Sequence, residues 1–352
     1  MRTIRIGNRL IGDDEPVFII AEAGSNHNAS LEQAYRLIDV AAEAGADAVK
    51  FQNFSADKIY PKTEATVDYL QRLGVHKPIY DIIRDMEMPY DWVPLLAQRC
   101  QSRDIIFLST PFDEEAADVL DPHVEAFKIA SYELTHFPLI RHVAKKGKPI
   151  FLSTGAAFGL EEVRSALDVA RRVGNIDLVV NQCTARYPCP PEAVNVRTVA
   201  TMRSQLGVYT GLSDHSRDPL CAPVAATGLG AVALEKHFTL SNRLPGPDHA
   251  FAVEPHELKV MVQAVRCVKF MLGNGEKKRH AVEEELANYR RAVFTIKPVR
   301  AGDPFTRANV AVLRKPGMPE AGLSPDSIER VLTRTAGKDL PAYVLVHEED
   351  VR

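Results

Sequence analysis

Short apolar runs alternate with helix-like stretches over the first 272 residues, and this alternation constrains the fold more than any other feature. Eight β-like runs occur, at 17–21, 47–52, 104–110, 126–129, 149–155, 178–183, 208–213 and 231–235. The helix-like stretches are 31–44, closed by Gly45, then 91–102, 113–120, 136–146, 160–173, 192–206, 217–228 and 254–272. Alternating strands and helices form right-handed βαβ units and therefore a parallel sheet. Eight such units in roughly 270 residues predict a (β/α)₈ barrel.

Three further observations shape this prediction. An open, doubly wound sheet is the alternative, but it would gather polar motifs at one switch point, and here they follow nearly every strand. The segment 53–90 is a long, polar connection with no regular pattern, which is typical of a functional loop or lid. We expect a barrel domain over 1–272, a charged linker over 273–289 and a small, mostly β domain over 290–352. Some 60 residues are marginally stable alone, so this last domain should dock onto the barrel or onto a partner subunit.

Composition excludes several classes of protein. The formal net charge of −3 and the lack of any basic run of five residues argue against nucleic-acid binding. No apolar stretch approaches the ~20 residues that cross a bilayer, and the N-terminus lacks the apolar core of a signal peptide. The five cysteines are odd in number and have no Cys-x-x-Cys spacing, so a reducing cytoplasm is expected. Cys183 ends a strand and is either a nucleophile or a buried structural thiol.

Two lysines are predicted to meet at the mouth of the barrel. Lys50 and Lys128 fall on the last turn of the second and fourth strands, and the C-terminal rim carries the chemistry of barrel enzymes. Two ammonium groups would repel each other there unless an anion lay between them. Ser131, Ser153 and Ser213 add hydroxyl donors at the same level. The set predicts phosphate binding, and the alternative is a pair of rim lysines in surface ion pairs.

Two histidines follow the seventh and eighth strands. Neighbouring parallel strands lie about 4.8 Å apart, so His215 and His237 could share one ion at roughly 2.1 Å each. A two-histidine site with open positions suits Lewis-acid chemistry with Mn²⁺, Zn²⁺ or Fe²⁺. The alternative is two histidines whose hydrogen bonds are satisfied within the fold.

Other rim residues allow two interpretations each. Glu22 and Glu133 could hold a water or move a proton, or they could neutralise the rim lysines. Asp248 could bind sugar hydroxyls or cap its own loop, and Tyr187 could face substrate or only start the next helix. His27 is expected to organise the first loop rather than to bind metal.

Seven motifs together resemble the sialic acid synthase family. They are Ala-Glu-Ala-Gly-Ser-Asn-His at 21–27, Lys-Phe-Gln at 50–52, Phe-Lys-Ile-Ala-Ser at 127–131, Ser-Thr-Gly at 153–155, Cys-Thr-Ala-Arg-Tyr-Pro at 183–188, Gly-Leu-Ser-Asp-His at 211–215 and Glu-Lys-His-Phe at 235–238. The resemblance runs from about residue 15 to 272. The tail from residue 290 to 310 is similar to the antifreeze-like (SAF) domain that follows the barrel in that family.

The resemblance implies condensation of phosphoenolpyruvate with the open-chain aldehyde of an N-acyl amino sugar, giving a nine-carbon 2-keto-3-deoxy acid and phosphate. It also implies a divalent metal, Mn²⁺ in the first place with Mg²⁺ or Co²⁺ as alternatives, and a domain-swapped homodimer. By position, the residues that would hold phosphoenolpyruvate are Lys50, Lys128, Ser131, Ser153 and Ser213, and the metal would be bound by His215 and His237. The proton and water steps would use Glu22, Gln52 and Glu133. The acceptor would contact Tyr187 and Asp248.

Two positions depart from the family pattern. Ala185 stands where an asparagine or serine usually binds phosphoenolpyruvate, and Lys315 stands where an arginine of the tail usually reaches the acceptor across the dimer. Lysine supplies the charge but not the planar fork. The acceptor therefore stays open among N-acetylmannosamine, its 6-phosphate and a di-N-acetylated 6-deoxy sugar. The alternative functions are another phosphoenolpyruvate–sugar condensing synthase, which the β domain argues against, and a non-catalytic carbohydrate-binding protein.

Overall fold

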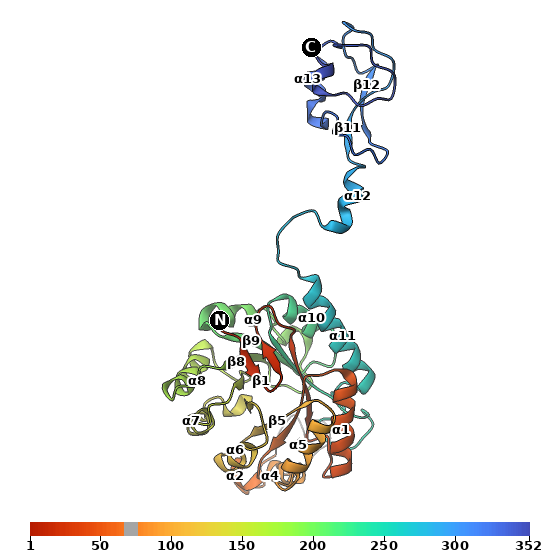
Figure 1. The fold of residues 1–352 in the computed structure, drawn as a ribbon. Coiled ribbons are helices and arrows are strands. Elements are labelled where there is room, and N and C mark those ends of the chain that lie inside the picture. The colour runs from red at the N-terminus through yellow and green to blue at the C-terminus, as the bar shows by residue number, and fades with distance from the viewer. Residues whose placement is uncertain (67–76) are drawn as a thin grey trace. The chain divides into compact units, whose positions relative to one another are not determined.

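Eight parallel strands form the wall of a barrel in the N-terminal part of the chain (Figure 1). The computed structural model describes residues 1–66 and 77–352. The strands are β3 (Phe18–Gly24), β4 (Ala48–Asn53), β5 (Ile106–Pro111), β6 (Phe127–Ile129), β7 (Ile150–Ser153), β8 (Leu178–Cys183), β9 (Tyr209–Asp214) and β10 (Ala233–His237). They pair in the order β5-β4-β3-β10-β9-β8-β7-β6, and β5 contacts β6, so the sheet is nearly closed. The predicted barrel is confirmed.

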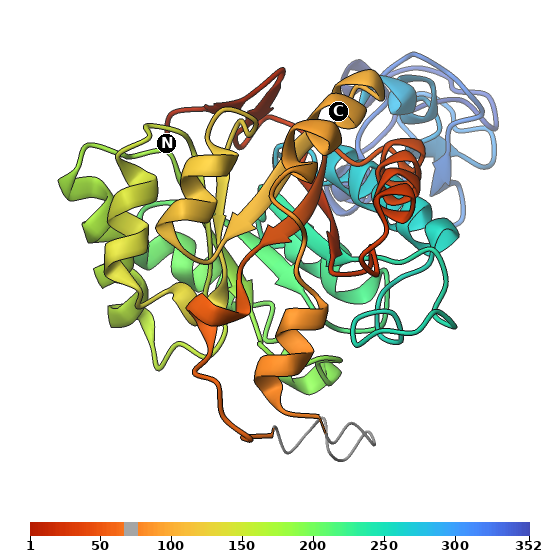
Figure 2. The same ribbon diagram turned by 90° about the horizontal axis from the view of Figure 1, so that it is seen from below.

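Helices surround the barrel in the view of Figure 2. They are α1 (Leu31–Ala44), α5 (Trp92–Ser102), α6 (Glu114–Leu120), α7 (Phe137–Ala144), α8 (Leu160–Arg172), α9 (Thr198–Leu206), α10 (Cys221–Gly228) and α11 (Pro255–Met271). Gly45 ends α1 with a φ of 83°, and its N–H bonds to the carbonyls of Ala41 and Ala42, as its role as a C-cap predicts. Two helices begin later than predicted. A 3₁₀ turn at Pro191–Ala193 precedes α9, and a loop that ends before Cys221 precedes α10.

A small hairpin at the N-terminus was not predicted. Strands β1 (Ile4–Ile6) and β2 (Arg9–Ile11) pair antiparallel. Their buried isoleucines pack with Phe18 and Phe151 from the barrel strands in one apolar cluster. The hairpin therefore closes the end of the barrel interior that lies opposite the predicted mouth.

The segment 53–90 is more regular than its sequence indicates. It contains α2 (Ala56–Ile59) and α4 (Ile79–Asp85), which pack against each other and lie away from the N-terminal residue in Figure 1. The expectation of an irregular segment is wrong for these residues. Residues 67–76, which belong to the same predicted loop, lie outside the described residues. A role for the segment as a lid stays a prediction.

The C-terminal residues 274–352 form a second compact unit, which follows the first unit, 1–273, in the sequence. The second unit contains a 3₁₀ turn (Ala281–Glu283), α12 (Glu284–Ala287), the antiparallel strands β11 (Arg291–Thr295) and β12 (Val310–Arg314), and α13 (Ile328–Val331). It has its own apolar core, which includes Val293, Phe305 and Val346. Its identity as an SAF domain stays a prediction.

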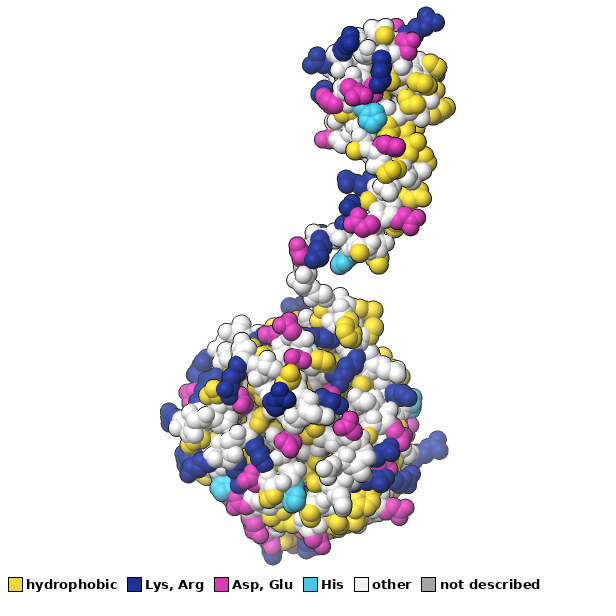
Figure 3. All heavy atoms as spheres, viewed as in Figure 1, with side chains coloured by type: hydrophobic (Ala, Val, Ile, Leu, Met, Phe, Trp, Pro, Cys, Tyr) yellow, Lys and Arg dark blue, Asp and Glu magenta, His cyan; other side chains and the backbone are white. Residues whose placement is uncertain are grey.

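The surface charges and the helices bear on two partners that the composition argues against, nucleic acid and a membrane. On the face of the barrel unit drawn in Figure 3, lysine and arginine side chains are interspersed with aspartates and glutamates. This face thus carries no broad basic patch of the kind that binds nucleic acid. Among the described residues, no helix combines the length and the apolarity that crossing a bilayer requires.

The barrel wall predicts one stability effect. A Cβ at Gly211, in β9, would overlap the carbonyl oxygen of Ala233 and the side-chain oxygen of Asn181 on the neighbouring strands. We expect Gly211→Ala to lower the free energy of unfolding by about 2 kcal/mol or more in urea titrations. Gly228→Ala is the matched control, because no atom lies within 4 Å of a Cβ built there. Equal stability of the two variants would contradict the packing described.

Candidate active site

Two connected cavities open at the carboxyl ends of the barrel strands. The inner chamber is small, about 50 Å³, and is lined by Glu22, Lys50, Gln52, Thr110, Phe112, Lys128, Ala130, Ser131, Ser153, Cys183, Tyr187, Ser213, His215, Glu235 and His237. The outer chamber, of about 360 Å³, shares Gln52, Phe112, Ala130, Ser131, Tyr187 and His237 with it and adds residues of α2, α4 and the loops after β6 and β10. All predicted site residues except Lys315 line one chamber or both.

Two lysines and two glutamates form a buried cluster in the inner chamber. Lys50 Nζ lies 2.7 Å from Glu22 Oε2 and 3.7 Å from Glu235 Oε1, and Lys128 Nζ lies 2.6 Å from Glu235 Oε2. All four side chains are at most 4% exposed. A carboxylate of the protein, that of Glu235, which the sequence did not single out, thus lies between the lysines. Phosphate binding by the lysines stays a prediction.

The lysines also lie deeper than predicted. Lys50 is the third of six residues in β4 and Lys128 is the central residue of β6, so neither ends its strand. Surface ion pairs, the alternative interpretation, are excluded by this burial. Because the side chains start below the rim, their ammonium groups reach the floor of the cavity rather than its edge.

Burial and charge act in opposite directions on the two glutamates. Burial raises the pKa of Glu22 to about 7 although Lys50 opposes the change. Burial alone would also raise the pKa of Glu235, but Lys128 and Lys50 lower it to about 2. Glu235 is thus a permanent anion at neutral pH, whereas Glu22 can carry a proton.

The predicted serines differ in how far they are already engaged. Ser213 Oγ donates to Glu235 Oε1 at 3.1 Å, and Ser131 Oγ accepts from the Gly155 N–H at 3.0 Å. Ser153 Oγ is buried and has no hydrogen-bond partner among the described residues. Ser153 is therefore the hydroxyl most open to a ligand.

The backbone at Gly155 packs closely against Ser131, which lines the inner chamber. A Cβ at this position would lie 2.6 Å from Ser131 Oγ and 2.8 Å from Ala185 Cβ. Ala185 and Ser131, a residue of the predicted phosphate site, thus flank Gly155. The methyl side chain of Ala185 has no hydrogen-bond donor, so it cannot make the contact that an asparagine or serine would make at this position.

The two histidines lie together, as predicted. The rings of His215 and His237 have centroids 5.3 Å apart, and Tyr187 stacks on His215 at 4.1 Å. Burial lowers the pKa of His215 to about 4, and burial and then His215 lower that of His237 well below its usual value. Both imidazoles are therefore neutral and have lone pairs.

The donor set of the histidines fits a shared divalent ion. His215 Nδ1 lies 3.0 Å from the carbonyl of Thr184, which makes Nδ1 the N–H donor and leaves Nε2 as a ligand. His237 Nδ1 is buried and has no hydrogen-bond partner among the described residues. These residues contain no group of three or more His, Cys, Asp or Glu placed to hold a metal, so water or substrate would complete the coordination.

Two further carboxyl groups face the outer chamber. Burial raises the pKa of Glu133 to about 7, and its Oε2 has no partner among the described residues. Burial also raises the pKa of Asp248 to about 6, and its Oδ2 lies 3.9 Å from His237 Nδ1. Gln52 donates to Glu22 Oε1 at 2.8 Å, so it orients that carboxyl group.

Several alternatives from the sequence are decided by contacts. Burial raises the pKa of Cys183 to about 11, so it is a thiol and not a ready nucleophile. His27 Nδ1 accepts from the Ala29 N–H at 3.1 Å, which confirms that it organises the first loop. Lys236 pairs with Asp214 at 2.6 Å, away from both chambers, so these two motif residues are structural. Lys315 donates to the Glu320 carbonyl within the second unit.

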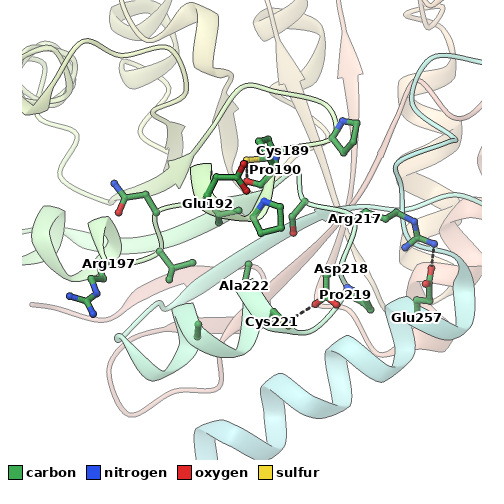
Figure 4. A pocket seen from close by; sticks show the side chains of 17 residues that line it. Cys189, Pro190, Glu192, Arg197, Arg217, Asp218, Pro219, Cys221, Ala222 and Glu257 are labelled. Carbon is green, nitrogen blue, oxygen red and sulfur yellow. Dashed lines mark hydrogen bonds and ion pairs between the residues drawn. The ribbon is translucent and has the colours of Figure 1, made fainter. Parts of the chain in front are cut away.

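A third cavity, larger than the two chambers, lies outside the barrel mouth. Figure 4 shows this space of about 1170 Å³ between the loops after β8 and β9 and helices α10 and α11. Arg217 there pairs with Glu257 at 2.9 Å, and Asp218 accepts from the first N–H groups of α10. These contacts hold loops and a helix end in place, so chemistry is better sought at the two chambers.

Comparison with known proteins identifies close relatives over the whole length. The NeuB family model matches residues 37–277. The spore coat polysaccharide biosynthesis protein SpsE of Bacillus subtilis is 41% identical over 368 aligned residues, which cover 100% of this chain and 98% of that protein. The N,N'-diacetyllegionaminic acid synthase of Legionella pneumophila is 36% identical and covers 94% of this chain and 93% of its own. The structure of the N-acetylneuraminic acid synthetase of Leptospira borgpetersenii matches with a TM-score of 0.72 at 32% identity, covering 81% of this chain and 95% of that one.

The buried cluster predicts a link between stability and anion binding. Glu235→Gln removes the carboxylate between the lysines, so we expect the free energy of unfolding to fall by about 3 kcal/mol. We also expect inorganic phosphate to raise the melting temperature of this variant more than that of the wild type. Asp214→Asn is the control, because it also removes the carboxylate partner of a buried lysine, but outside the chambers. A similar phosphate response in both variants would show that the lysines do not form an anion site.

Glu133 predicts a dependence of stability on pH. Because its pKa is about 7 in the folded chain against 4.5 ordinarily, the folded state keeps a proton that the unfolded state loses. Stability should therefore fall as pH rises from about 4.5 to about 7. Glu133→Gln should flatten this slope in urea titrations, with Glu22 and Asp248 retaining part of it. Glu161→Gln, at a side chain 90% exposed, should run parallel to the wild type; parallel curves for Glu133→Gln would refute the assignment.

Proposed function

The chain belongs to the NeuB family, and from this premise we propose that it condenses phosphoenolpyruvate with the open-chain aldehyde of an N-acyl amino sugar. The products would be phosphate and a nonulosonic, sialic-type acid. The observation that carries the proposal is the placement of two buried lysines and an open serine directly beside two neutral histidines. Relatives named as legionaminic and pseudaminic acid synthases support it.

Phosphoenolpyruvate would occupy the inner chamber. Lys50 and Lys128 would face its phosphate and carboxylate, and the hydroxyls of Ser131, Ser153 and Ser213 would donate to them. Ser213 would have to turn from Glu235, whereas Ser153 is open already. The lysines would stabilise the phosphate both as part of the substrate and as leaving group.

A divalent metal, Mn²⁺ in the first place, would be held by His215 and His237 at the junction of the chambers. When bound, it supplies the Lewis acidity that stabilises the alkoxide formed from the aldehyde. Tyr187, stacked on His215, would fix the orientation of that ring and shield it from water. Asp248, on the loop next to His237, would accept hydrogen bonds from sugar hydroxyls.

The remaining groups move protons and place water. The enol carbon of phosphoenolpyruvate forms a bond to the aldehyde carbon, water then adds at the carbon that bears the phosphate, and the C–O bond to phosphate breaks. Glu133, with a pKa of about 7, would exchange a proton with the acceptor at neutral pH. Glu22, oriented by Gln52 and Lys50, would position the water and receive its proton.

We also propose that the protein works as a homodimer. Val282 is 88% exposed and Leu286 63% exposed, and hydrophobic side chains gather on the surface of the C-terminal unit in Figure 3. A second copy would cover this apolar surface. Lys315 would then be available to contact the acceptor of the partner subunit.

Metal removal tests the proposal. With phosphoenolpyruvate, Mn²⁺ and a panel of N-acyl amino sugars, we expect phosphate and keto-acid release that stops after chelation and returns with Mn²⁺. His215→Ala should lower turnover on the order of 100-fold to 1,000-fold, whereas His256→Ala, at an exposed histidine, should not. Phosphate release at an undiminished rate after chelation would refute the metal assignment. Sugar binding without product from any acceptor would favour a non-catalytic protein.

A further inference from the structure

An exposed Asn-Gly pair begins the second compact unit. Asn274 and Gly275 lie just beyond α11, which ends at Met271, and all of residues 271–280 are exposed. No other asparagine of the sequence is followed by glycine. The backbone nitrogen of the next residue can attack an asparagine side chain, and glycine shields that nitrogen least because it has no Cβ.

The contacts of Asn274 favour such an attack. Its Oδ1 accepts a hydrogen bond from the Glu276 N–H at 3.0 Å, so the side-chain amide is held against the backbone of Gly275. The same N–H would stabilise the negative charge that develops on Oδ1 when a nucleophile adds to Cγ. The attacking group is available as well, because no hydrogen bond engages the Gly275 N–H in the part of the chain that the structure describes.

The backbone around the pair has room to change conformation. Gly275 has a φ of 76°, which residues with a Cβ rarely adopt. Among the described residues, no atom lies within 4 Å of a Cβ built on Gly273 or on Gly275. No packing therefore has to be broken when the side chain of Asn274 closes onto the backbone.

We propose that Asn274 is a site of spontaneous covalent modification. The Gly275 nitrogen gives up its proton and bonds to Asn274 Cγ, the bond from Cγ to the side-chain nitrogen breaks, and that nitrogen leaves as ammonia with the proton. The product is a succinimide. Water then opens either carbonyl of the ring and leaves aspartate or isoaspartate, so no oxidant, metal or second protein takes part.

The modification changes the connection between the two compact units. Gly273 is the last residue of the first unit and Asn274 is the first residue of the second. Aspartate adds a negative charge there, and isoaspartate also carries the main chain through its β-carbon, which lengthens the connection by a methylene group. Neither Asn274 nor Gly275 lines the inner or the outer chamber, so the modification is independent of the proposed function.

The test follows the full-length protein during incubation at about pH 9 and at about pH 6, with mass spectrometry of its tryptic peptides. The peptide 270–277, released by cleavage after Lys269 and Lys277, should give two isomeric products about 1 Da heavier. They should form faster at the higher pH, because the nitrogen must lose its proton. Peptides that contain Asn8 and Asn195, exposed asparagines followed by arginine and valine, are internal controls and should stay unmodified.

Gly275→Ala tests the attacking group. It should slow formation of the heavier products by about tenfold or more, because a Cβ hinders the approach of the nitrogen and restricts the turn. Equal rates in this variant and the wild type would overturn the proposal. A peptide 270–277 that keeps its mass at about pH 9, or that gains mass no faster than the peptides with Asn8 and Asn195, would overturn it as well.

Discussion

The bridge that Glu235 makes between Lys128 and Lys50 is the interaction on which the site depends. Two ammonium groups buried inside a barrel would be costly and would repel each other, but the carboxylate of Glu235 lies between them and Glu22 pairs with Lys50. The carboxylates thereby hold the lysines in place, while burial lowers the pKa of Lys128 despite its pairing with Glu235. Under the proposed function, an entering dianion would meet lysines that are already positioned and would not have to assemble them.

The barrel separates two kinds of environment that the proposed reaction needs. Strand residues supply the charged floor, whereas α2, α4 and the rim loops supply an apolar antechamber. His237 and Tyr187 belong to both chambers and so mark the place where an enol and an aldehyde would meet. The neutral state of the histidines follows from the same burial that keeps Glu133 and Asp248 close to protonation at neutral pH.

Much of this arrangement could be predicted from the sequence, because periodicity reports on strands and helices and a closed barrel brings strand ends together. The adjacency of His215 and His237 follows from that topology alone. The hairpin of β1 and β2 was missed because strands of three residues show no pattern, and α2 was missed because four residues span about one turn. Glu235 was overlooked as a partner of the lysines, because which side chains pair inside a barrel depends on their height along the strands, which the order of motifs does not reveal.

A crystal structure of the protein with phosphoenolpyruvate and Mn²⁺, with the metal located by its anomalous scattering, tests the central claim most directly. The account predicts a phosphate group within hydrogen-bond distance of Lys128 and Ser153, and a metal peak bonded to the imidazoles of residues 215 and 237. Phosphoenolpyruvate bound in the large cavity between the loops after β8 and β9, or a metal peak remote from both histidines, would contradict it.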